Sequence, residues 1–142
     1  MKNEDLILML VDKSTNAFGE LFGLAQETKF KIALTIIQET IVTAFGINCV
    51  LLTSETLADI LEKGRIDIEQ SYILTNLLLV QAELLLKSRK SIESLGNYEN
   101  ALQIIQWQTM QPVERNHFEK QNKITELKAV IESLKMNSEI NN

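Results

Sequence analysis

Two stretches of this sequence decide the fold, KFKIALTIIQ at residues 29–38 and NYENALQIIQ at residues 97–106. Each contains an aromatic residue, an alanine three positions later and an isoleucine four positions after that, which is the spacing of one helix face. The small alanine lets two helices approach closely, while the aromatic ring and the isoleucine fill the space on either side. The sequence therefore predicts two helices that pack through the same set of positions, namely Phe30, Ala33, Ile37, Tyr98, Ala101 and Ile105.

The composition favours long helices over strands. The chain has 142 residues, of which 45% are hydrophobic, with one proline and five glycines. A chain of this length suits a single domain with a substantial core, and its few turn-forming residues do not fit the frequent turns of a β-sandwich. We therefore expect an all-α fold of about six helices in one bundle, with no sheet.

Helix boundaries follow from capping residues, glycines and the single proline. Asp67 and Gln70 form a capping-box pattern at the start of the most apolar helix. Gly96 and Asn97 predict a turn between that helix and the next, and INCVLLT, residues 47–53, is predicted to be a buried connector. The expected helices cover residues 3–23, 28–45, 53–63, 67–95, 98–110 and 113–136.

The spacing of the two repeated stretches is that of a helical repeat. Phe30 and Tyr98 lie 68 residues apart, which is twice the tetratricopeptide period of about 34 residues. LGNYENALQII, residues 95–105, resembles the second-helix signature of such a repeat, and Pro112 lies close to the position of its terminal proline. A midway copy is missing, so the expected arrangement is a set of tetratricopeptide-like antiparallel hairpins and not a full solenoid.

Three segments in order, ALTIIQETI, LLTSETLADILEKGRIDIEQSYILTNLLLVQAELL and SLGNYENALQII, resemble a family of small, uncharacterised bacterial all-helical proteins with a tetratricopeptide-like C-terminal hairpin. The resemblance covers residues 1–107, implies an all-helical fold and brings no catalytic residue with it. We accordingly expect a tetratricopeptide-like helical domain at residues 1–111, a C-terminal extension helix at 112–136 and a frayed tail at 137–142.

Charge and apolar patterning restrict the partners and the compartment. The formal net charge is −5, which disfavours nucleic acid because phosphate contacts supply most of that affinity. The dense basic cluster Lys87, Arg89 and Lys90 is predicted to be a solvated helix face. The longest apolar stretch is shorter than the roughly 20 residues that a membrane span needs. Because Cys49 is the only cysteine and no signal peptide is recognisable, we expect a cytoplasmic protein.

No catalytic, metal or cofactor motif is present in the sequence, which has no glycine-rich phosphate loop, no C-x-x-C and no H-E-x-x-H. Cys49 lies in an apolar connector and is predicted to be an inert thiol. His117, the only histidine, is predicted to be a partly exposed helix residue. We therefore predict a protein that is not an enzyme and that uses no cofactor and no metal ion.

The last predicted helix carries a narrow apolar seam with the spacing of a coiled coil, formed by Ile124, Leu127, Ile131 and Leu134. Two interpretations are open: the seam packs on its own chain, or it pairs with a second chain in a homodimer. Trp107 likewise is either a core residue beneath this helix or an anchor for a partner, because tryptophan is enriched at interface hot spots.

These features favour a non-enzymatic adaptor module that binds a protein or peptide, because helical hairpins present grooves without needing polar chemistry. The alternative is a helical sensor that binds a small apolar ligand or peptide inside the bundle and signals to a partner such as a transcription factor. In both cases the expected partner is a protein or peptide, with no nucleic acid and no membrane.

Overall fold

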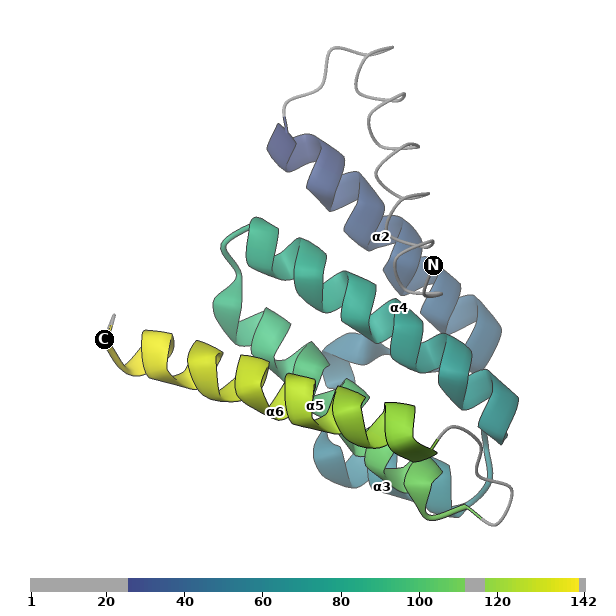
Figure 1. The fold of residues 1–142 in the computed structure, drawn as a ribbon. Coiled ribbons are helices and arrows are strands. Elements are labelled where there is room, and N and C mark those ends of the chain that lie inside the picture. Colours follow the sequence, from purple (N-terminus) through teal and green to yellow (C-terminus); the bar gives the residue numbers. More distant parts are fainter. Residues whose placement is uncertain (1–25, 112–116, 141–142) are drawn as a thin grey trace.

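The computed structural model describes residues 26–111 and 117–140, and this part of the chain consists of helices with short connections and no strand (Figure 1). The elements are α2 (Gln26–Phe45), the short 3-10 helix η1 (Cys49–Leu51), α3 (Ser54–Glu62), α4 (Ile68–Lys87), α5 (Ser91–Thr109) and α6 (His117–Ile140). The predicted all-α fold is confirmed. The helix predicted at residues 3–23 lies outside the described residues.

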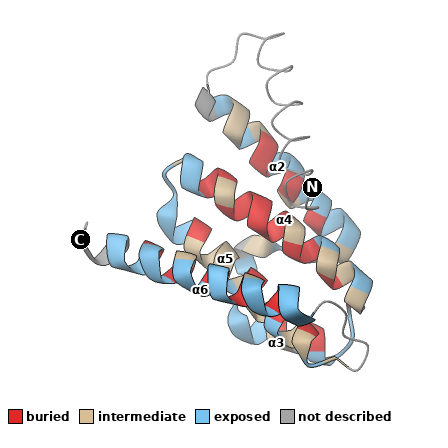
Figure 2. Ribbon diagram, viewed as in Figure 1, coloured by how far each residue is buried: buried red, intermediate tan, exposed pale blue. Residues whose placement is uncertain are grey.

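The central helix of the core is α4. It packs on α2 and most extensively on α5, while α3 and α6 pack on α5. Between Leu74 and Leu85 it is buried nearly all round (Figure 2), as expected for a helix with neighbours on several sides. Both helices that carry a repeated stretch therefore share α4 as a partner. The repeated positions are buried at Ala33, Ile37, Ala101 and Ile105 and half-buried at Phe30 and Tyr98.

Polar contacts fix α5 antiparallel to α4. In each of them a side chain of one helix reaches across to the other, and the sequence separation of the partners grows away from the turn between the helices. These hydrogen bonds run from Ser94 Oγ to the Ala82 carbonyl (2.6 Å), from Gln81 Nε2 to Asn97 Oδ1 (2.7 Å) and from Gln108 Nε2 to Ser71 Oγ (3.0 Å). Within an otherwise apolar interface, these hydrogen bonds thus set the register of α5 along α4.

The predicted boundary between these two helices is wrong. We expected a turn at Gly96 and Asn97, but α4 ends at Lys87 and both residues lie inside α5. Asn97 accepts a hydrogen bond from Gln81 and donates through Nδ2 to the Glu93 carbonyl at 2.9 Å. Its side chain therefore joins two helices instead of capping one, and Gly96 is not the turn residue that a tetratricopeptide signature would require.

Other predicted helix ends are confirmed. Gly46 and Gly64 adopt positive φ angles of 66° and 67° just after α2 and α3, a backbone conformation that glycine tolerates best. The Thr53 side chain accepts a backbone hydrogen bond at the N-cap of α3. At the start of α4, Asp67 and Gln70 form the predicted capping box, with hydrogen bonds of 2.8 and 2.9 Å.

Two further predictions need correction. The connector after α2 is only partly buried: Ile47 is 3% exposed, but Leu51 is 71% exposed because a single 3-10 turn can bury only one of its sides. At the other end, α6 continues to Ile140, so most of the tail predicted to fray at residues 137–142 is helical.

Candidate functional site

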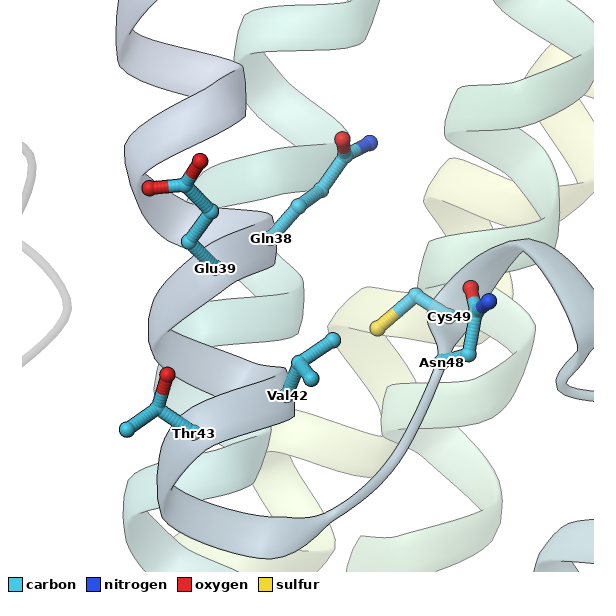
Figure 3. A pocket seen from close by; sticks show the side chains of 6 residues that line it. All are labelled: Gln38, Glu39, Val42, Thr43, Asn48 and Cys49. Carbon is cyan, nitrogen blue, oxygen red and sulfur yellow. The ribbon is translucent and has the colours of Figure 1, made fainter.

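An open groove lies beside the C-terminal half of α2, where the chain leaves this helix and enters η1 (Figure 3). Its volume is about 360 Å³, which is within the range of small-ligand and peptide-side-chain sites. Gln38 and Val42 extend from the side of α2 that faces η1, whereas Glu39 and Thr43 extend from its other side (Figure 3). The groove is lined by Gln38, Glu39, Val42, Thr43, Asn48 and Cys49.

The local backbone positions the two sides of the groove. After α2 ends, Gly46 reverses the chain, and its amide donates to the Val42 carbonyl at 2.9 Å. Ile47 then inserts into the core and anchors the connector. The chain rises beside α2 and places Asn48 and Cys49 opposite the helix (Figure 3). The groove is therefore a consequence of one left-handed glycine and one buried isoleucine.

Cys49 is a protonated thiol in this setting. Burial raises its pKa above the ordinary value of 9.0, and a hydrogen bond with the Gln81 side chain opposes this shift to a smaller extent. Because the thiolate is the nucleophile, Cys49 is a poor nucleophile at neutral pH. This agrees with the inert thiol expected from its apolar sequence context.

Next to Cys49, the buried side chain of Gln81 has a hydrogen-bond acceptor that no described residue uses. Gln81 is 2% exposed, and its Nε2 donates to Asn97. Its Oε1 has no hydrogen-bond partner among the described residues. An unpaired buried carbonyl oxygen is unusual and costs free energy. Polar side chains thus continue from the groove, past Cys49, to Gln81 in the core.

The groove is electronegative. Glu39 is the only charged side chain among its lining residues, and it extends from the side of α2 that faces away from Asn48 and Cys49 (Figure 3). The groove also lies at the C-terminal end of α2, where the helix dipole places partial negative charge, and the last turn of α2 has no basic residue to neutralise it. These groups favour a ligand that offers N–H donors over one that brings a carboxylate or phosphate.

The predicted seam of α6 is buried within the single chain. Its residues Ile124, Leu127, Ile131 and Leu134 are 7%, 3%, 6% and 8% exposed, and α6 packs on α5. Packing on its own chain accounts for this burial. Pairing of the same seam with a second chain would require α6 to leave α5.

A polar contact also holds the start of α6. Lys120 is 8% exposed, and its Nζ donates to the Tyr72 hydroxyl of α4 at 3.0 Å. The same ammonium group lies 5.2 Å from the centre of the Tyr72 ring, a favourable cation–π distance. Trp107 is half-buried and packs against the hydrophobic core.

Other predicted features do not form a site. His117 is exposed at the first residue of α6. No group of three or more His, Cys, Asp or Glu residues within 26–111 and 117–140 is arranged to hold a metal ion. None of the described helices is both long and apolar enough to span a bilayer.

Sequence patterns did not point to the groove. Its residues come from α2, from the first residue of η1 and from Asn48 just before it, and none of these segments carries a motif. The signal that comes closest is the position of Gly46 before INCVLLT, which marks a chain reversal. Comparisons of this chain with protein-family models, with curated proteins and with solved structures found no match.

Proposed function

We propose that this protein is a non-enzymatic peptide-binding module and that the groove beside α2 receives the peptide. The observation that carries the proposal is the groove itself, an open space of about 360 Å³ that is lined by four polar side chains and by Val42 and Cys49. An extended peptide can offer backbone N–H groups to such a lining and place one side chain against Val42.

A sensor for a small apolar ligand has less support. Four of the six residues that line the groove have polar side chains, and an apolar ligand cannot satisfy their hydrogen-bonding groups when it displaces water from them. A ligand inside the bundle would have to displace side chains of α4, which is buried nearly all round. The signalling role and the transcription-factor partner of this alternative therefore have no supporting observation.

We include in this proposal that the helices pack in a tetratricopeptide-like manner derived from a repeat. Both helices with the repeated aromatic, alanine and isoleucine pack on α4, as two copies of one packing device would. In tetratricopeptide proteins such helices build the walls of peptide-binding grooves. With a single cysteine in the chain, we place the module in a reducing compartment such as the cytoplasm.

Selection from a phage-displayed library of random peptides tests the proposal. The full chain is the bait, and the affinity of enriched peptides is then measured by fluorescence anisotropy on two matched variants, Val42→Asp and Ile36→Asp. These residues are both β-branched, both on α2 and 50% and 51% exposed, but only Val42 lines the groove. We expect Val42→Asp to weaken binding about tenfold or more and Ile36→Asp to leave it unchanged.

Two results would contradict the proposal. One is the absence of any enriched peptide. The other is an equal loss of binding in both variants, which would indicate a general effect on α2. Far-ultraviolet circular dichroism and thermal unfolding of each variant establish that the helices are intact.

A further inference from the structure

The turn between α4 and α5 carries exposed cations and exposed apolar side chains. Figure 1 shows where this turn joins the two helices. We name the set Leu86, Lys87, Arg89, Lys90 and Ile92 the basic corner. Its three basic residues are all exposed, and Leu86 and Ile92 are 39% and 78% exposed. The turn accordingly appears in pale blue in Figure 2. An isoleucine this exposed contributes little to the core.

The turn of the basic corner has a residue other than glycine in the left-handed backbone conformation. Arg89 has a φ of 62°, and it is the only residue other than glycine with a positive φ in the described part of the chain. Its amide donates to the Leu86 carbonyl at 3.0 Å, and the amide of Lys90 donates to the Leu85 carbonyl at 2.8 Å. These two bonds form a Schellman motif, in which glycine is the usual left-handed residue.

The other two helix ends of this kind show the contrast. After α2 and α3, Gly46 and Gly64 occupy the left-handed position. Only after α4 does an arginine stand there, although a side chain at positive φ is sterically unfavourable. Folding therefore does not account for the identity of Arg89. Strained residues of this kind cluster at functional sites.

Among the described residues, the cations of the basic corner form no ion pair. The described ion pairs join Lys63 to Asp59 and Lys123 to Glu126, and no described carboxylate lies within ion-pair distance of Lys87, Arg89 or Lys90. Glu93, in the first turn of α5, is also exposed, so residues 86–93 carry three cations and one carboxylate and are locally positive in a chain with a net charge of −5. An incoming acidic group would not have to displace an ion-pair partner from the described part of the chain.

We propose that the basic corner is a docking surface for an acidic segment of a partner protein that also carries an apolar side chain. Carboxylates of the segment pair with Lys87, Arg89 and Lys90, and its apolar side chain covers Ile92. The inference rests on the proposed binding function but concerns a surface that shares no residue with the groove.

The number of basic residues in the basic corner favours a short acidic peptide segment over anionic lipid or DNA as the partner. Recognition of anionic lipid headgroups generally uses clusters of roughly 4–8 basic residues, and tight DNA binding uses roughly 6–10 phosphate contacts. The basic corner supplies three cations, and the rest of the acidic chain would repel an extended polyanion. A short acidic segment contacts only the corner, because screening limits charge interactions to about 10 Å.

The test uses a fluorescein-labelled peptide in which Glu alternates with Leu, titrated with the full chain and followed by fluorescence anisotropy. The double variant Lys87→Ala/Lys90→Ala should bind about tenfold more weakly, and binding to the wild type should weaken as salt is raised. Lys31→Ala removes an exposed lysine of α2 and should leave the affinity unchanged. Ile92→Ser should weaken binding of this peptide but not of a version with Ser in place of Leu.

Arg89→Gly separates binding from folding. Glycine relieves the positive φ, so thermal unfolding should occur at the same or a higher temperature, while the peptide binds severalfold more weakly. A merely structural role for Arg89 would instead leave the affinity for the peptide unchanged.

Three results would overturn the proposal. They are no binding of the acidic peptide by the wild type, equal binding by the double variant, and corner-dependent binding of phosphatidylserine vesicles without binding of the peptide. The last result would identify a lipid surface as the occupant. The groove variant Val42→Asp should bind the acidic peptide like the wild type, so failure at the corner and failure at the groove are distinguishable.

Discussion

Gln106 and Gln108 have the same side chain two positions apart on α5, but only Gln108 is buried, at 2% exposure, with its Nε2 bonded to Ser71 Oγ. Gln108→Ala removes this bond and leaves a small cavity, so the free energy of unfolding should fall by about 1–3 kcal/mol. Gln106→Ala is the matched control and should change it by less than about 0.5 kcal/mol. Urea denaturation followed by circular dichroism measures both, and equal effects would contradict the assignment.

Cys49 makes a contribution to the free energy of unfolding that depends on pH, and the sign of this contribution follows from the raised pKa of the thiol. When pH rises past the pKa of the unfolded chain, near 9.0, the unfolded thiol loses its proton before the folded one does. The unfolded state is then favoured, so this contribution to stability is fully present at lower pH and is lost as pH rises toward the folded pKa.

The measurement is the difference in the free energy of unfolding between the wild type and Cys49→Ala as a function of pH. This difference isolates the contribution of the thiol from those of all other groups in the chain. It should be constant at neutral pH and should move against the wild type above about pH 9. A difference that stays flat across this range would show that the thiol is not shielded.

Residue roles were predictable where they depend on local spacing. The buried alanines of the two repeated stretches and the Asp67–Gln70 capping box follow from positions a few residues apart. Asn97 was assigned wrongly because its role depends on Gln81, which is remote in sequence and becomes a neighbour only when α4 and α5 are in register. A side chain that can serve as a cap or as a tertiary bridge has no sequence signature for the choice.

At the scale of the elements, the α4–α5 boundary shows why helix ends are harder to predict than helices. Glycines mark the ends of α2 and α3, and both ends were predicted. The end of α4 has Arg89 in the left-handed position, and an arginine gives no stop signal. The groove was missed for a related reason, since it is made where two elements meet and neither carries a motif.

The attachment of α6 to α5 gives a prediction for a whole element. Leu127 is 3% exposed, in the seam that packs within the chain. Leu127→Ala should lower the free energy of unfolding by about 2–4 kcal/mol, as large-to-small changes in cores do. The adjacent Lys128 is exposed, so Lys128→Ala should have little effect. If both variants unfold like the wild type in urea, α6 is not held by its seam.

For the whole molecule, burial of the seam predicts the state of association. The apolar surface of α6 that a homodimer would use is covered within the chain, so we expect a monomer of 16.2 kDa in solution. Light scattering coupled to size-exclusion chromatography measures this mass directly. A stable dimer that persists in Leu127→Ala would show that another surface mediates association.

The short turn at Arg89 also has a consequence for how the chain folds. Contacts between α4 and α5 join residues as few as 12 and 16 positions apart, whereas the bonds from Gln103 to Ser54 and from Lys120 to Tyr72 close loops of 49 and 48. Shorter loops cost less entropy to close, so we expect the α4–α5 hairpin to be the folding nucleus on which the other helices assemble.

Stopped-flow kinetics of two core variants tests this order of events. Leu78 is fully buried in α4, so Leu78→Ala should mainly slow refolding, because its contacts form in the transition state. Leu127→Ala should mainly accelerate unfolding, because α6 docks afterwards. The reverse pattern would place α6 in the nucleus. If the kinetics follow the expected pattern, the hairpin that Arg89 closes forms early in folding. Arg89, at a position where glycine would be less strained, then influences the rate of folding as well as the surface of the folded protein.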